Sequence, residues 1–152
     1  VSIALVSKAG IPQLGVVFDP TSSTLYHATL GLGAFKNGEL WEGKSTKTTE
    51  KTALTLVTDI SFKQHRDFPV FAKKIEKIAK KLGYSGVKIF DQGGAVMNAV
   101  WVLENRPAYY VKLPKKALGG GSLWDYAATA CIFNQAGAHV SDIHGNPLYL
   151  SN

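Results

Sequence analysis

Alternating apolar and polar residues in the first third of the chain predict a series of short strands. A period of two is typical of strands that bury one face. The pattern predicts strands at residues 1–5, 14–18, 24–29 and 53–57. The polar residues 19–23 form a loop between two of these strands, and Asn37-Gly38 is a typical hairpin turn. We therefore expect residues 1–58 to form antiparallel strands that complete one sheet layer.

The rest of the chain alternates between helical and strand-like patterns. After Asp67, apolar residues recur at helical spacing while five lysines occupy the other face, and Gly83 ends the pattern. Helices are predicted at about 67–82, 95–103 and 126–135, and strands at 87–90, 108–111 and 138–142. The strand 87–90 is expected to be buried. Residues 59–152 are thus expected to form an α/β domain, and the fold class is α+β joined to α/β.

Composition narrows the class of protein. The chain has 152 residues, of which 45% are hydrophobic, and a net charge of +6. No apolar run approaches the roughly 18 residues that a membrane span needs. The lysine-rich helix lacks interleaved aromatic residues, so we expect a solvated face and no nucleic-acid partner. The single cysteine, Cys131, cannot form a disulfide within the chain, which is compatible with a cytoplasmic protein. We also expect no membrane partner.

The segment around Asp125 carries the strongest candidate chemistry. A glycine run, residues 119–121, leads through Ser122 into the last helix, and glycines allow backbone to approach a ligand closely. A carboxylate in the first turn of a helix also caps free amides and is favoured by the helix dipole. Both interpretations are open from this segment alone. The small residues that follow permit close packing of the helix: Ala127, Ala128, Ala130 and Cys131.

The longer motif resembles a known family. It runs from Trp124-Asp125-x-Ala127-Ala128 through Gln135-Ala136-Gly137-Ala138 to a predicted strand ending at Asp142. It is similar to the second signature of the inositol monophosphatase family, which includes bisphosphate nucleotidases and is magnesium-dependent and lithium-sensitive. The resemblance implies that Asp125 is a metal ligand, that the cofactor is Mg²⁺, and that the complete enzyme has a layered α/β/α/β/α sugar-phosphatase-like fold. Asp142 is expected to form a turn before His144.

The resemblance extends along the chain, but the family's first signature is missing. The hairpin segments are similar, Arg106–Tyr110 resembles a family strand, and Gly93-Gly94-Ala95 resembles the Gly-Ser-Ala loop. Neither a Glu-Glu pair nor Asp-Pro-Ile-Asp-Gly-Thr is present, and the one Asp-Pro, Asp19-Pro20, falls in the hairpin. The resemblance therefore implies the C-terminal half of a phosphatase. We assign no catalytic residue and expect the isolated chain to be inactive.

Substrate-binding residues are expected at two places. Gly93, Gly94 and Ala95 lie between a strand and a helix, where backbone amides can bind phosphate; a tight turn is the alternative interpretation. The other candidates are Ser122, Lys112, Lys115 and Lys116, of which the lysines would attract a polyanionic ester. No acid lies between Pro107 and Trp124, where the family's inositol phosphatases carry one. This absence favours a 3′(2′),5′-bisphosphate nucleotide over inositol phosphate.

Two functions remain open. The first is a Mg²⁺-dependent phosphomonoester hydrolase acting on a small phosphorylated metabolite. The second is a non-catalytic interaction or regulatory module that uses the basic helix as its contact surface. In either case an apolar sheet face is expected to pair with a missing N-terminal half or with a second copy. That face includes Val16, Phe18, Leu25 and Phe35.

Overall fold

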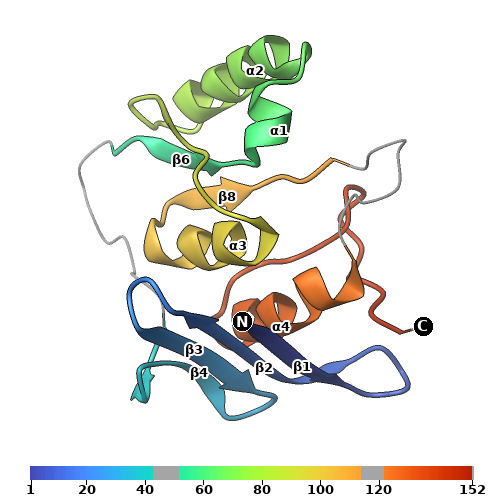
Figure 1. The fold of residues 1–152 in the computed structure, drawn as a ribbon. Helices are drawn as coiled ribbons and strands as arrows, with labels where there is room; N and C mark the ends of the chain where they lie inside the picture. The colour runs from blue at the N-terminus through green and yellow to red at the C-terminus, as the bar shows by residue number, and fades with distance from the viewer. Residues whose placement is uncertain (43–51, 114–121, 152) are drawn as a thin grey trace. The chain divides into compact units, whose positions relative to one another are not determined.

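The computed structural model describes residues 1–42, 52–113 and 122–151, which Figure 1 shows as a ribbon. The chain forms two compact units. The first unit combines Val1–Gly43 with Pro114–Asn152, and the second unit is Lys44–Leu113. The chain therefore begins in the first unit, builds the second, and returns to complete the first.

The first unit is built on a five-stranded antiparallel sheet in which each strand pairs with the next one in sequence. Its strands are β1 (Ser2–Val6), β2 (Pro12–Asp19), β3 (Thr24–Thr29), β4 (Gly33–Lys36) and β5 (Glu39–Leu40). Asn37 and Gly38 join β4 to β5 with φ angles of 51° and 85°. Positive φ at both residues is what a type I′ hairpin requires. The strands and the hairpin expected from the alternating pattern are therefore present.

Helix α4 (Leu123–Gln135) packs on one face of this sheet (Figure 1). It begins three residues earlier than the predicted start at 126, because Ser122 has extended backbone and acts as its N-cap. The helix comes very close to β2: a Cβ added to Gly15 would lie 2.3 Å from the carbonyl oxygen of Ala128. The small side chains of α4 are buried, as the sequence predicted.

The opposite face of the sheet is apolar, and much of it is exposed. Phe18 and Leu25 face each other across β2 and β3 and are 38% and 36% exposed. Ile3 and Leu5 on the edge strand β1 are more exposed still. Val16 and Phe35 are half-buried on the same face. The apolar face expected from the sequence is thus present.

The second unit contains a three-stranded parallel sheet in the order β7-β6-β8. Its elements are β6 (Leu54–Val57), α1 (Ile60–Lys63), α2 (Phe68–Lys81), β7 (Val87–Phe90), α3 (Ala95–Glu104) and β8 (Ala108–Tyr110). Figure 1 shows α1 and α2 on one side of the strands and α3 on the other. Leu56 and Val57 of the central strand are fully buried, as are Val100 and Leu103 of α3.

This topology corrects the expected division at residue 58. Strand β6 pairs in parallel with β7 and β8, so it belongs to the second unit and not to the antiparallel layer. Residues 122–151, expected in the α/β domain, belong to the first unit, because α4 packs on β1, β2 and β3. The division fails because it followed chain order, whereas contacts between distant segments decide the grouping.

Three smaller expectations also differ from the structure. Strand β7 lies at an edge of its sheet, and its residues Lys88 and Ile89 are exposed, so the predicted buried strand is half-exposed. Residues 138–142 are irregular instead of forming a strand. The apolar side of α2 is only partly covered, since Ile78 is 50% exposed and Leu82, just past the helix, is 68% exposed.

No helix in the three described ranges is long and apolar enough to cross a bilayer.

The basic face of α2 is exposed, as expected, with Lys73, Lys74 and Lys77 open to solvent. Unlike these lysines, the acidic Glu76 contacts another element. Its carboxylate accepts a hydrogen bond from the amide of Val87 (3.0 Å) and pairs with Lys80 (3.3 Å). Glu76 thereby ties α2 to the start of β7.

Candidate functional site

Asp125 lies in the first turn of α4, where it has the capping role that its sequence position allows. The amide of Ser122 donates to Asp125 Oδ2 (2.9 Å), so one carboxylate oxygen caps the helix start. Within the described residues, Asp125 Oδ1 accepts no hydrogen bond. A half-buried carboxylate with one oxygen fixed and the other open has a defined orientation. Such a group suits a hard cation such as Mg²⁺.

The loop Gly93-Gly94-Ala95 joins the end of β7 to the start of α3. Gly94 has extended backbone, with φ −76° and ψ 171°, and its carbonyl accepts the first helical bond, from the amide of Asn98 (2.9 Å). The amides ahead of that bond have no intrahelical partner and point outward from the helix N-terminus. This geometry is able to bind an anion.

The two glycines of this loop serve different purposes. A Cβ at Gly93 would lie 2.4 Å from the ring of Trp101 and 2.5 Å from Asn98 Oδ1, so only glycine fits there. A Cβ at Gly94 would meet nothing within 4 Å. Gly93 therefore packs the loop against α3. The space beside Gly94 is open to a small side chain. This agrees with the Gly-Ser-Ala loop that residues 93–95 resemble, in which a serine stands at the position of Gly94.

Asp59 is the centre of a polar cluster that the sequence did not reveal. It is the second residue after β6, and its Oδ1 accepts hydrogen bonds from Asn98 Nδ2 (3.0 Å) and from the Tyr110 hydroxyl (2.8 Å). Lys112 Nζ lies 3.5 Å from Asp59 Oδ2, and the two side chains are 18% and 16% exposed. The cluster thus joins β6, α3 and the residues after β8.

A second ion pair lies at the ends of the same strands. Asp91, the residue after β7, pairs with Lys63 at the end of α1. Together with Asp59 and Lys112 this places two acids and two lysines after the carboxyl ends of the parallel strands. Their formal charges cancel. These four described side chains therefore form a polar group without a net formal charge.

The predicted site residues divide between the two units. Ser122 and Asp125 belong to the first unit, whereas residues 93–95 and Lys112 belong to the second. Lys115, Lys116 and the glycine run 119–121 lie outside the described residues. Asp59, Asn98 and Tyr110 were missed. The signal that points to Asp59 is an acidic residue just past the carboxyl end of a parallel strand, where ligands bind in α/β sheets.

The described part of the chain offers no complete metal site. No group of three or more His, Cys, Asp or Glu side chains there could hold a metal ion. Asp125 is therefore chemically suited to Mg²⁺, but the described residues do not form a complete site around it. Two histidines contact neighbouring side chains: His27 stacks on Phe35 with ring centroids 5.0 Å apart, and His65 lies 3.6 Å from a carboxylate oxygen of Asp67.

Asp142 forms the turn that the sequence predicted. Its Oδ1 accepts hydrogen bonds from the amides of His144 and Asn146, each at 2.8 Å. The hydrogen bond from the Asn146 side chain is the main cause that lowers the pKa of Asp142 below its ordinary value. All of these partners lie within the turn, so Asp142 is a structural residue of the segment after α4.

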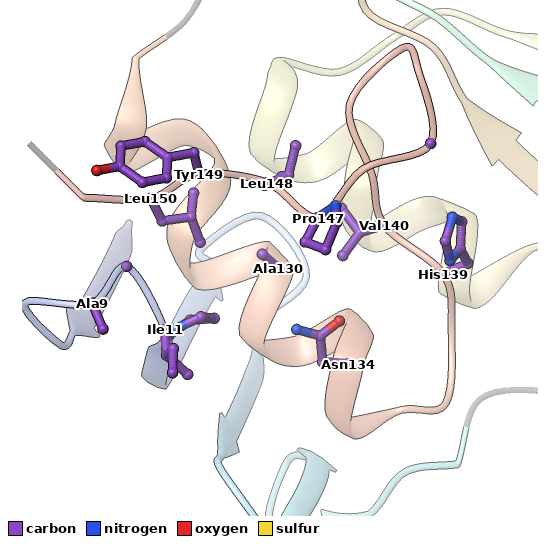
Figure 2. Close-up of a pocket in the computed structure, with 13 residues that line it drawn as sticks. Ala9, Ile11, Ala130, Asn134, His139, Val140, Pro147, Leu148, Tyr149 and Leu150 are labelled. Atoms are coloured by element: carbon purple, nitrogen blue, oxygen red, sulfur yellow. The ribbon is translucent and has the colours of Figure 1, made fainter.

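A pocket of about 580 Å³ lies in the first unit, between the β1–β2 turn, α4 and the C-terminal segment (Figure 2). Ile11, Val140 and Leu148 contribute apolar side chains, while Asn134 and His139 are polar. No acidic or basic residue except the histidine lines it, and Asp125 is not part of it. A phosphate and its metal need charged ligands, so this pocket is not the candidate site.

Comparison with solved structures gives the class of protein first. The fold matches inositol monophosphatase-II from Staphylococcus aureus with a TM-score of 0.70 and 21% identity, covering 98% of this chain and 52% of that one. The two units together thus have the fold of about half an inositol monophosphatase.

Sequence comparison then gives the family. The model of the inositol monophosphatase family matches residues 1–152, and the chain belongs to this family. It is 31% identical over 153 residues to the Nus factor SuhB of Pasteurella multocida, covering 52% of that protein. It is 30% identical over 135 residues to inositol monophosphatase 2 of Saccharomyces cerevisiae, covering 44% of it. The chain therefore spans about half the length of these relatives.

Proposed function

We propose that this chain supplies one metal ligand and the phosphate-binding loop of a Mg²⁺-dependent phosphomonoester hydrolase. The observation that carries the proposal is Asp125, a carboxylate oriented by the amide of Ser122 with its second oxygen open among the described residues. Family membership supports a metal-dependent phosphatase. Bound Mg²⁺ would neutralise charge on the phosphate and lower the pKa of the attacking water. The lithium sensitivity known in the family is expected here with the same metal site.

The phosphate of the substrate is proposed to bind at the start of α3. Loop 93–95 offers backbone amides there, and the helix dipole favours an anion at this end. Gly93 keeps the loop close to α3, because a side chain at this position would clash with Asn98 and Trp101. Ser122 is proposed to orient Asp125, because its amide donates a hydrogen bond to the Asp125 carboxylate. The substrate class is a small phosphorylated metabolite.

The chain alone is expected to lack phosphatase activity. No group of three or more His, Cys, Asp or Glu side chains in the described residues could hold a metal ion, and Mg²⁺ sites in phosphoryl-transfer enzymes need several oxygen ligands. The test is Mg²⁺-dependent release of phosphate from a generic phosphomonoester, measured for residues 1–152 and for a whole protein that contains them. The expected result is that the whole protein releases phosphate and that residues 1–152 by themselves do not. The expectation is wrong if residues 1–152 release phosphate and the substitution Asp125→Ala abolishes that release.

We further propose that protein covers the apolar face of the five-stranded sheet. In the whole protein the partner is another part of the polypeptide, and in the chain alone it is a second copy. The exposed Ile3, Leu5 and Phe18 support this proposal, as does the outer edge of β1, which pairs with no strand among the described residues. Such surfaces drive pairing with another chain.

The expected result for residues 1–152 is self-association at micromolar concentration, measured by sedimentation velocity. Ile3→Lys with Leu5→Lys should shift the chain toward monomer, because two charges would enter the interface. Val70→Lys is the matched control, since Val70 is 60% exposed on α2 in the second unit. A monomeric wild-type chain whose β1 amides resist hydrogen exchange would refute the proposal.

The second candidate function is a non-catalytic interaction module. The exposed Ile78 and Leu82 beside the lysines of α2 favour it, because they give the basic face apolar contact area. The two candidates differ in one measurable respect. A non-catalytic module would leave the whole protein without Mg²⁺-dependent turnover of any phosphomonoester, whatever residue stands at position 125.

A further inference from the structure

The pocket in Figure 2 is separate from the proposed metal and phosphate sites, and the first unit builds it alone. Its lining residues come from three segments: the β1–β2 turn, one face of α4, and residues 139–150. Its volume is about 580 Å³, and sites for small molecules usually measure about 300–1,000 Å³. The pocket is therefore large enough for a small organic ligand.

The walls of the pocket are held in place by close backbone packing. Gly10 has a φ angle of 76° in the β1–β2 turn. A Cβ added there would lie 3.1 Å from the amide nitrogen of Ser151 and 3.3 Å from that of Leu150. The turn thus lies directly against the C-terminal segment. The hydrogen bonds to Asp142 order the chain between α4 and that segment, so the pocket is already formed without a ligand.

The surface of the pocket is mainly apolar and suits an uncharged ligand. Ala130 is buried at 2% exposure, whereas Ile11 and Tyr149 are 49% and 82% exposed. A ligand would cover these apolar side chains and remove them from water. The described lining residues include no Asp, Glu, Lys or Arg. A charged ligand would lose its hydration there without gaining an ion pair.

Asn134 gives this apolar pocket a specific polar group. It lies four residues after Ala130, on the same face of α4. Its side chain makes no hydrogen bond within the described residues. A carboxamide carries an acceptor and a donor side by side. Its complement is an edge with a donor next to an acceptor, as in a lactam, which allows two parallel hydrogen bonds.

Tyr149 gives the pocket a flat apolar surface. Its ring lines the pocket and is the most exposed of the large apolar side chains in the described residues. Aromatic rings stack in offset or tilted geometry, which adds to the gain from burial alone. A planar ligand is therefore able to use the ring of Tyr149 and the carboxamide of Asn134 together.

We propose that this pocket is a second ligand site, which binds an uncharged planar molecule with a lactam edge. Asn134 recognises the edge and Tyr149 covers the ring. The inference is independent of the proposed phosphatase function, because the site involves neither the metal nor the phosphate.

The test uses three planar, uncharged probes that differ in their polar edge. Carbostyril is a lactam, N-methylcarbostyril lacks its N–H donor, and quinoline lacks its carbonyl. Each is titrated into isotopically labelled residues 1–152 at about pH 8, where an ordinary imidazole is neutral, with NMR chemical shifts as the readout. Carbostyril should bind with a Kd of about 1 mM or below. It should bind about fivefold more tightly than the other two probes.

The chemical shifts also locate the bound probe. The largest changes are expected at Ile11, Ala130 and Leu148, which line the pocket. The amides of β6, β7 and α3 should keep their shifts, because these elements belong to the second unit.

Three variants assign the roles. Asn134→Leu has nearly the same size at an exposed position, and it should bring the three affinities within about twofold of one another. Tyr149→Ala should weaken all three probes by about threefold and keep the preference for the lactam. Gln64→Leu is the matched control, because it removes an exposed carboxamide in the second unit and should change neither affinity nor preference.

Three results would each overturn the inference. The first is that carbostyril shifts no resonance at millimolar concentration, or shifts resonances away from the pocket. The second is that the wild-type chain binds the three probes equally, since the pocket would then be an unselective apolar groove. The third is that Asn134→Leu keeps the preference for carbostyril, because another group would then recognise the lactam edge.

Discussion

Replacing Asp125 with asparagine should lower phosphatase activity at least about a hundredfold in a whole protein that contains this chain. Loss of even an outer-shell partner of a metal ligand costs about 10–100-fold, and the proposal makes Asp125 a ligand itself. The fold should survive, because an asparagine oxygen can still accept the hydrogen bond that Ser122 now donates to Asp125. The loss should therefore appear in kcat and in the Mg²⁺ requirement, with little change in thermal stability.

The matched control for this experiment is Asp19→Asn. Asp19 also accepts hydrogen bonds from nearby residues, from the amide of Thr21 (3.0 Å) and the hydroxyl of Ser22 (2.7 Å), but it lies in the loop after β2. Activity should stay within about twofold of wild type, as is usual for a surface change far from the chemistry. Near-normal turnover by Asp125→Asn at saturating Mg²⁺ would remove Asp125 from the metal site.

Local patterns predicted most of the secondary structure. The strands of the antiparallel sheet were readable because each has one buried and one exposed face, as Val17 and Phe18 show in β2. Helix α2 was readable because Pro69 marks its first turn and Gly83 adopts positive φ after its end. Each of these signals is decided within a few residues, so sequence alone is enough.

The grouping of the elements was not predictable in the same way. Residues 54–57 form a short apolar run, and such a run fits a parallel or an antiparallel strand equally well. Only its pairing with β7 and β8, from segments more than 30 residues further along the chain, makes it the centre of a parallel sheet. Assigning it to the antiparallel layer also concealed Asp59, because the rule about carboxyl ends applies to parallel strands.

Only part of the candidate site was predicted, because its other residues come together from segments that are far apart in the sequence. Asp125 and the loop 93–95 stand in continuous motifs, which a resemblance can identify directly. The cluster of Asp59, Asn98, Tyr110 and Lys112 comes from three elements and becomes visible only when the sheet is assembled. Lys112 was a candidate for its charge, but its partner and its position required the structure.

Gly15→Ala should destabilise the first unit by about 3 kcal/mol, near the upper end of the usual cost of overpacking. The added methyl group would lie 2.3 Å from the carbonyl oxygen of Ala128 and 3.0 Å from its Cα. Both are backbone atoms of α4, so no side chain can rotate away. The helix would have to move off β2, and the neighbouring buried contacts of Val17 and Ala28 would loosen with it.

Hydrogen exchange resolves this effect unit by unit. Amides of β2, β3 and α4 should lose protection in Gly15→Ala, while those of β6, β7 and β8 keep theirs, because the second unit has its own core. Gly94→Ala is the control, since its Cβ would meet nothing within 4 Å and its φ of −76° suits any residue. It should be neutral or stabilise by up to about 1 kcal/mol. Unchanged protection of β2 and α4 in Gly15→Ala would mean that the close contact between strand and helix does not hold the first unit together.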